Sequence, residues 1–145
     1  MLPPSDIVTE GLRVRAVAEF VHTESGSDAE RFVYVYRIEF SNEGDRQARL
    51  LARHWIIVDA EGRRHDVRGD GVVGDFPTLE PGGSYHYTSW CPLMTEWGTM
   101  EGEFTFERTD GTTFEAKVGR FYLTPDSALS GTVTGQSPEH QSRLL

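Results

Sequence analysis

Three glycines at positions 69–74 carry the most direct chemical meaning in this sequence. Gly69, Gly71 and Gly74 give the pattern Gly-x-Gly-x-x-Gly. In dinucleotide-binding folds this pattern ends a strand and opens a helix, whose first N–H groups bind a pyrophosphate. Here Pro77 and Pro81 follow, together with further glycines, so a helix cannot begin on that schedule. The segment is therefore predicted to be a turn between two strands.

This glycine loop could still bind an anion, because backbone N–H groups in a glycine-rich turn can surround a phosphate. Positive charge would come from arginines near in sequence, and Asp70 and Asp75 would oppose it. These arginines are Arg53, Arg63, Arg64 and Arg68. A purely structural turn is the favoured interpretation, and a ligand site is the alternative. The candidate ligand-binding residues are Gly69, Gly71, Gly74, Arg53, His54 and Arg68.

His54 leaves two interpretations open. A histidine can ligate a metal ion or move a proton, but one that is hydrogen-bonded within a strand is the simpler interpretation. A metal site would have to gather its ligands from separate strands, because no pair has the close spacing of a structural zinc site. The residues available for it are His54, His65, Asp66, Asp70 and His86. We assign no metal ligands and no resident cofactor, and keep a divalent cation as the alternative.

No residue stands in a recognisable nucleophile motif. Cys91 precedes Pro92, and Ser89 follows an aromatic run. Neither context matches the strand-to-helix turns or paired bases that activate a serine or cysteine. The acidic residues of 101–115 alternate with apolar ones and are interpreted as a solvated strand face. The sequence therefore predicts no catalytic residue.

The elements that position these residues are strands, since apolar and polar residues alternate along most of the chain. Successive side chains of a strand point to opposite faces, so each alternating run predicts one buried and one exposed face. Seven such runs are separated by turn residues, which predicts an all-β, two-sheet antiparallel sandwich of the immunoglobulin or fibronectin type III kind. The runs are 12–20, 32–40, 48–59, 63–68, 84–90, 99–108 and 112–123.

The run 48–59 is apolar on both parities, which indicates a central strand or a strand at a homodimer contact. Trp55 is expected in the core, with His54 on the opposite face. The alternation slips by one residue at Gly119, which predicts a β-bulge. Residues 22–30 are expected to be a polar loop. We predict a single domain over 1–124 and a flexible tail over 125–145.

Composition limits the partners. The formal net charge is −9, which disfavours generic nucleic-acid binding. The single cysteine, Cys91, fits a reducing compartment. The first residues do not resemble a secretory signal and no run of 18 apolar residues occurs, so we expect no membrane partner and a cytoplasmic location.

From about residue 31 to 123 the sequence resembles the ApaG family, on six runs that occur in the right order. The runs are 31–38 (Arg-Phe-Val-Tyr-Val-Tyr-Arg-Ile), 50–57 (Leu-Leu-Ala-Arg-His-Trp-Ile-Ile), the glycine loop, 79–83 (Leu-Glu-Pro-Gly-Gly), 85–89 (Tyr-His-Tyr-Thr-Ser) and 98–102 (Gly-Thr-Met-Glu-Gly). Where the family has Gln-Pro after the glycine loop, this chain has Asp75-Phe76-Pro77. Where the family has Thr-Pro-x-Gly-Thr-Met, it has Thr95-Glu96-Trp97-Gly98-Thr99-Met100, and Trp90-Cys91-Pro92 follows the Tyr-Thr-Ser run where a glycine is common. These departures predict a more aromatic mouth beside the loop.

The resemblance implies a fibronectin type III-like sandwich, a link to cobalt and magnesium homeostasis, and a glycine loop suggested as a pyrophosphate site. It implies no established enzymatic activity. The sequence and the resemblance together favour a non-enzymatic binding or interaction module, with a protein or a small phosphate-bearing ligand as partner. The alternative is a metal-assisted enzyme that acts on nucleotide polyphosphates.

Overall fold

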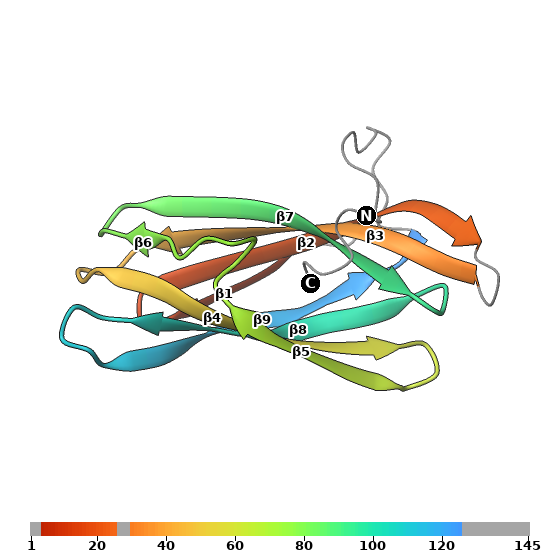
Figure 1. Cartoon of the computed structure of the whole chain (residues 1–145). Coiled ribbons are helices and arrows are strands. Elements are labelled where there is room, and N and C mark those ends of the chain that lie inside the picture. The colour runs from red at the N-terminus through yellow and green to blue at the C-terminus, as the bar shows by residue number, and fades with distance from the viewer. Residues whose placement is uncertain (1–3, 26–29, 126–145) are drawn as a thin grey trace.

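The computed structural model describes residues 4–25 and 30–125, in which all nine secondary-structure elements are strands (Figure 1). They are β1 (Ser5–Thr9), β2 (Leu12–Ser25), β3 (Glu30–Asn42), β4 (Ala48–Asp59), β5 (Arg64–Asp70), β6 (Thr78–Leu79), β7 (Ser84–Leu93), β8 (Gly98–Glu107) and β9 (Thr113–Leu123). Within these residues, no helix has the length and apolar character needed to cross a bilayer. The predicted tail lies, apart from Pro125, outside the described residues.

The strands form two antiparallel sheets that face each other. The first sheet has the order β1-β2-β3-β7, and the second has the order β5-β4-β8-β9 with β6 beside β4. This arrangement confirms the predicted all-β sandwich. The two strands beyond the seven predicted, β1 and β6, are short. β1 exposes its three central residues and β6 has only two residues, so neither leaves an alternating pattern in the sequence.

The core consists of aromatic rings from both inner faces. Trp55 of β4 meets Tyr36 of β3 with ring centroids 5.4 Å apart, and meets Phe104 of β8 at 5.5 Å. Both contacts are edge-to-face, which is a favoured geometry for aromatic pairs. Trp55 is only 1% exposed, so its predicted place in the core is confirmed. The strand pleat turns His54 to the outer face of the second sheet.

Two local predictions have different outcomes. The bulge at Gly119 is confirmed, because the β8–β9 register shifts where Gly119 and its neighbour Arg120 oppose Glu101 alone. The loop predicted over 22–30 is wrong at its two ends, because β2 continues to Ser25 and β3 begins at Glu30, and 26–29 lie outside the described residues. The ends of these two strands bond to each other as a ribbon, where polar residues pair as well as apolar ones.

β4 occupies the middle of the second sheet, between β5 and β8. Its outward side chains Ile56 and Val58 are half-buried among the side chains of these neighbours. The apolar character of both faces therefore matches a central strand. The homodimer contact stays a prediction.

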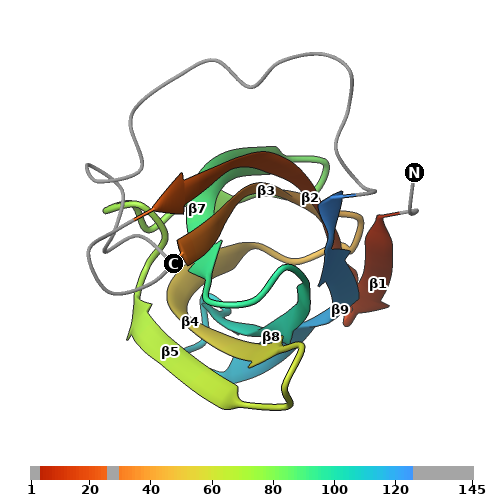
Figure 2. The same cartoon turned by 90° about the vertical axis from the view of Figure 1, so that its right-hand side faces the viewer.

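The sandwich is closed along one side and open along the other (Figure 2). On the closed side β1 packs on β9, where Thr9 Oγ1 accepts a hydrogen bond from the Lys117 N–H and Ile7 lies against Gly119. On the open side the edge strands β5 and β7 lie apart, without a ladder between them. The glycine loop follows β5, at one end of this open side.

Arg108 fastens three segments at one end of the molecule. It is 7% exposed, and its guanidinium donates to the carbonyls of Glu10 (2.8 Å), Arg46 (3.1 Å) and Gln47 (3.4 Å). The same group stacks on Phe114, with Cζ 4.3 Å from the ring centroid. A buried guanidinium is stable here because several carbonyls replace the water it loses.

Replacing Arg108 by Met keeps the apolar stem but removes every donor. We expect the free energy of unfolding to fall by about 2 kcal/mol, because buried carbonyls would lose their partners. Urea denaturation followed by tryptophan fluorescence measures the change. The control is Arg120→Met, which removes an exposed arginine with one ion pair to Glu101 and should leave the midpoint unchanged. An Arg108→Met protein as stable as the wild type would contradict the fastening role.

Candidate functional site

The glycine loop is a tight turn that leaves the end of β5. Gly69 is the last residue but one of β5 and lies opposite Arg53 of β4. The chain then reverses over 72–75, where the Val72 N–H donates to the Asp75 carbonyl (2.9 Å) and the Asp75 N–H donates to the Val72 carbonyl (2.8 Å). No helix follows the loop before β6. The chain therefore reverses here through a two-residue turn, and the loop does not lead into the helix whose dipole binds a pyrophosphate in dinucleotide-binding folds.

Two of the three loop glycines lie where a Cβ would meet other atoms of the chain, one against backbone and one against a side chain. Gly71 has φ +61°, and a Cβ there would lie 2.4 Å from the Asp75 carbonyl oxygen. Gly69 lies under the Arg53 guanidinium, where a Cβ would come within 2.7 Å of Cζ. Gly74 also has a positive φ, of +85°, but open space surrounds the position of its missing Cβ.

Arg53 braces the loop from below. Its Nη1 donates to the carbonyls of Asp70 (2.9 Å) and Gly71 (3.0 Å), and its guanidinium occupies the space that Gly69 leaves empty. The guanidinium therefore points at the backbone of the loop. Arg53 therefore has a structural role, as Trp55 has in the core and as His54 has in the row of charges described below.

The tip of the loop is strained and carries free donors. Val73 has φ +42°, an unusual conformation for a β-branched residue. Among the described residues, the N–H groups of Val73 and Gly74 have no acceptor, whereas the Gly71 N–H donates to the Leu51 carbonyl at 2.8 Å. Strain of this kind persists only where the surrounding structure imposes it.

The side chains that follow the loop fasten it to the first sheet. The Tyr85 hydroxyl of β7 donates to Asp75 Oδ2 at 2.8 Å. Phe76 is 43% exposed beside the loop, with Arg49 Cζ 5.8 Å from its ring centroid. An exposed aromatic ring therefore lies at the loop. Trp97 lies in the β7–β8 loop next to the far end of β4, so its expected place at this mouth is wrong.

His54 bridges two carboxylates on the outer face of the second sheet. Its Nδ1 lies 2.9 Å from Glu103 Oε2 on β8, and its Nε2 lies 2.8 Å from Asp66 Oδ2 on β5. Arg64 extends the row beyond Asp66, and Lys117 extends it beyond Glu103. One row of alternating charges therefore crosses β5, β4, β8 and β9.

Contacts along this row of charges shift the pKa values of His54 and Asp66. Hydrogen bonds to Glu103 and Asp66 raise the pKa of His54, although partial burial and the nearby Arg68 oppose them. Hydrogen bonds from Arg64 and His54 hold the pKa of Asp66 far below its usual range. Because each ring nitrogen faces a carboxylate, these contacts favour the doubly protonated imidazolium of His54, acting as a structural cation, over a proton carrier.

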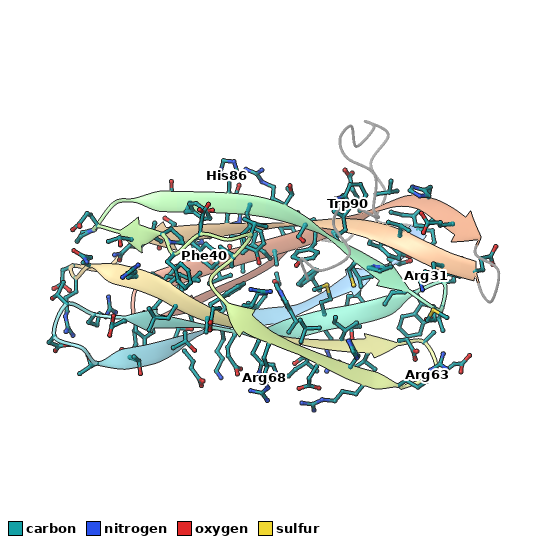
Figure 3. All side chains as sticks on the ribbon, in the orientation of Figure 1. Arg31, Phe40, Arg63, Arg68, His86 and Trp90 are labelled. Atoms are coloured by element: carbon teal, nitrogen blue, oxygen red, sulfur yellow. The ribbon has the colours of Figure 1, made fainter. Side chains whose placement is uncertain are left out.

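A shallow depression of about 320 Å³ brings four of the six predicted site residues together. It is lined by Arg53, His54, Arg68 and Gly69, and also by acidic side chains that include Asp70 and Glu103. Gly71 and Gly74 lie outside it. Arg68 is opposite His54 in the strand register, and its place on the lower face in Figure 3 is the outer face of the second sheet.

The residues with metal-ligating or nucleophilic chemistry are dispersed or engaged. Among the described residues, no group of three histidine, cysteine or acidic side chains is arranged to hold a metal ion. His86 lies on β7, in the other sheet from His54. Cys91 is completely buried, and burial raises the pKa of its thiol to about 12, so the thiol stays protonated.

Sequence reasoning missed Glu103 and Tyr85 as partners of the site. Glu103 was expected to be one of several solvated acids, yet it lies directly opposite His54 in the β4–β8 register. Its alternation with apolar residues gave its face correctly. The register between β4 and β8 decides which glutamate of that face meets His54. That register leaves no local signal in the sequence of either strand.

Asparagine at positions 71 and 74 tests the two positive-φ glycines with one side chain. Gly71→Asn should lower the free energy of unfolding by about 3 kcal/mol, because the new Cβ collides with a backbone carbonyl. Gly74→Asn should cost about 1 kcal/mol or less, because asparagine tolerates this conformation and has room there. Chemical denaturation of both variants measures the difference. Equal costs would mean that the loop moves to accept the Gly71 substitution.

The charged row should make stability depend on pH through His54. A raised pKa in the folded state means that the stabilisation is complete below the ordinary histidine pKa of 6.5 and is lost as pH rises through the folded value. The stability difference between wild type and His54→Gln should therefore shrink from pH 6 upward. Urea titrations across this range, with NMR titration of the imidazole, measure it. A difference that grows with pH would contradict the imidazolium assignment.

Comparison with known proteins places the chain in a family. Residues 22–108 match the model of the ApaG domain. A protein named ApaG from Methylobacterium sp. (strain 4-46) is 46% identical over 115 residues, which cover 79% of this chain and 88% of that protein. An ApaG protein from Anaeromyxobacter dehalogenans (strain 2CP-C) is 43% identical over 126 residues, covering 87% and 99%.

Solved structures agree with this match. An X-ray structure of a structural-genomics target superposes with a TM-score of 0.77 at 34% identity, covering 88% of this chain and 96% of that one. A crystal structure described as an ApaA protein from Bordetella pertussis gives a TM-score of 0.70 at 35% identity, covering 86% and 97%. Both the sequence resemblance and the sandwich fold are thereby confirmed, and this chain belongs to the ApaG family.

Proposed function

We propose that this ApaG-family protein is a non-enzymatic binding module that takes a phosphate-bearing ligand between the glycine loop and Arg68. The observation that carries the proposal is the pairing of two cations, Arg68 and the His54 imidazolium, opposite each other at one depression. In the described part of the chain Arg68 has no ion-pair partner, and its charge opposes the protonation of His54. A bound anion would relieve this repulsion.

The state of the reactive groups supports binding over catalysis. Both ring nitrogens of His54 face carboxylates, and the Cys91 thiol is buried and protonated. A general base needs a free lone pair, and a nucleophile needs access to substrate. The metal-assisted reaction on nucleotide polyphosphates is the alternative. It would require the carboxylates of Asp66 or Glu103 to leave the histidine and bind a cation.

The wider role follows from the family. We propose a place in divalent-cation homeostasis and a cytoplasmic location, for which the single buried thiol of Cys91 is suitable. Under this proposal a cation reaches the site with its phosphate ligand, because the acidic side chains that also line the depression would otherwise repel the phosphate. A homodimer through the half-buried outer residues of β4, Ile56 and Val58, is a further part of the proposal.

A thermal-shift titration with pyrophosphate and ADP, with and without Mg²⁺ or Co²⁺, tests the binding proposal. A ligand at a hundredfold excess over its Kd stabilises a protein by about 2.7 kcal/mol, which is an easily measured rise in Tm. The rise should be lost in Arg68→Gln. It should persist in Arg37→Gln, which removes the same charge from β3 on the other sheet.

Three results would count against the proposal. An equal rise in Tm for wild type and Arg68→Gln would place the ligand elsewhere, and no rise with any phosphate would remove the ligand. Release of phosphate from ADP in the presence of a divalent cation would favour the enzyme. Light scattering at micromolar concentration tests the dimer separately, and a strictly monomeric protein would exclude it.

A further inference from the structure

A groove of about 610 Å³ lies at the opposite end of β5 from the glycine loop. It opens between the two sheets, where the start of β5 and the end of β7 lie apart. Ile57 and Leu93, both almost fully buried, belong to its apolar lining, together with Pro92 and the exposed Met94. The groove is therefore an apolar depression that reaches the core of the sandwich.

The loop beside this groove presents large apolar side chains from a fixed backbone. Met94 is 53% exposed and Trp97 is 46% exposed. The second sheet holds this β7–β8 loop through Thr95, whose Oγ1 accepts a hydrogen bond from the Ala60 N–H (3.0 Å) and donates to the Trp97 carbonyl (2.8 Å). The first sheet holds it through the Tyr34 hydroxyl, which donates to the Glu96 carbonyl. Because the loop is fixed, a partner would lose little entropy in ordering it.

The rim of the groove carries three arginines on a strongly negative protein. Arg31 comes from the first sheet, and Arg63 and Arg64 lie at the start of β5, as Figure 3 shows for Arg31 and Arg63 at the same end of the sandwich. Arg63 pairs with Asp59 (2.8 Å) and Glu61 (3.4 Å), and Arg64 pairs with Asp66 (2.7 Å). In the described chain Arg31 has no ion-pair partner. The chain as a whole has a net charge of −9.

We infer that this groove is a docking site for an extended peptide segment of a partner protein in which acidic residues alternate with large apolar ones. Apolar side chains of the segment fill the space over Ile57 and Leu93 and contact Met94, and a carboxylate of the segment pairs with Arg31. Tryptophan, methionine and arginine are the residue types enriched at such interfaces. The surface is separate from the proposed phosphate site, because most of the length of β5 lies between them.

The charge arrangement favours a peptide over a simple anion. Arg31 is the rim arginine without an ion pair in the described residues, and apolar surface adjoins it, so a small phosphate on Arg31 would leave that surface uncovered. An extended chain that alternates carboxylates with apolar side chains can pair with Arg31 and cover the apolar surface as well. The acidic character of the partner follows from charge complementarity with Arg31.

Fluorescence anisotropy with three labelled peptides tests this inference on the full chain. The probes alternate aspartate with leucine, lysine with leucine, and aspartate with serine. The aspartate–leucine peptide should bind at least about tenfold more tightly than either of the others, and raising the salt concentration should weaken it. NMR shift changes on binding should fall in 57–65 and 92–98.

Variants then separate the charged and apolar contributions. Arg31→Gln and Met94→Ser should each weaken the aspartate–leucine peptide by about tenfold or more, while the matched control Arg37→Gln leaves it unchanged. Each variant should keep the wild-type Tm, since neither side chain holds the loop backbone in place.

The inference would be overturned by equal binding of the three peptides, by no binding of the aspartate–leucine peptide, or by shift changes confined to the glycine loop. Self-association that both Arg31→Gln and Met94→Ser abolish would also overturn it, because the groove would then belong to a second copy of this chain. The phosphate titration gives an independent result in every case, since it depends on Arg68.

Discussion

The contact of Trp55 with rings from both sheets is the interaction on which the rest of this molecule depends. It fixes which face of β4 points inward, and a strand has only two faces. His54 must then point outward into the charged row, and Arg53 must point inward beneath the glycine loop. A slip of one residue would exchange these faces and place an imidazolium in the aromatic core. The packing of one tryptophan thus determines which way the two preceding side chains, His54 and Arg53, point.

The glycine loop, whose sequence resembles a dinucleotide-binding motif, is held in place by other residues of the same chain. The Arg53 guanidinium donates hydrogen bonds to two loop carbonyls, and the Tyr85 hydroxyl donates one to the Asp75 carboxylate. Glycine is needed at position 71 because a backbone carbonyl approaches closely, and at position 69 its missing side chain leaves the space that the Arg53 guanidinium fills. Any ligand meets only the tip, at Val73 and Gly74, and the outer face beside Arg68. The glycine pattern therefore has a structural explanation that is independent of any ligand.

Much of the fold could be predicted from alternation alone, because a half-buried strand has to alternate. The long strands, the place of Trp55 and the bulge at Gly119 all follow from it. β1 and β6 could not be found in this way, since β1 is mostly exposed and β6 is too short to alternate. The ribbon at His22–Ser25 was missed because its pairing depends on backbone hydrogen bonds that polar residues make equally well.

The candidate site was predictable in its residue types and less so in its contacts. Arg53, His54, Arg68 and Gly69 do share one depression, as their positions on adjacent strands allow. The choice of Glu103 over the other acids of β8 depends on the β4–β8 register, and the groove beyond β5 depends on how two loops approach each other. Both are long-range properties, and single-strand patterns carry no record of them.

The packing of β1 against β9 has a consequence for how the chain folds. Thr9 and Lys117 lie at opposite ends of the described sequence, and their hydrogen bond closes one side of the sandwich. During synthesis the N-terminal strands emerge first, and they cannot complete this side until β9 has left the ribosome. Because β9 also supplies Phe121 to the core around Trp55, that core forms late. Nascent chains of this sandwich therefore expose apolar surface for most of their synthesis, a period in which chaperones have access to it.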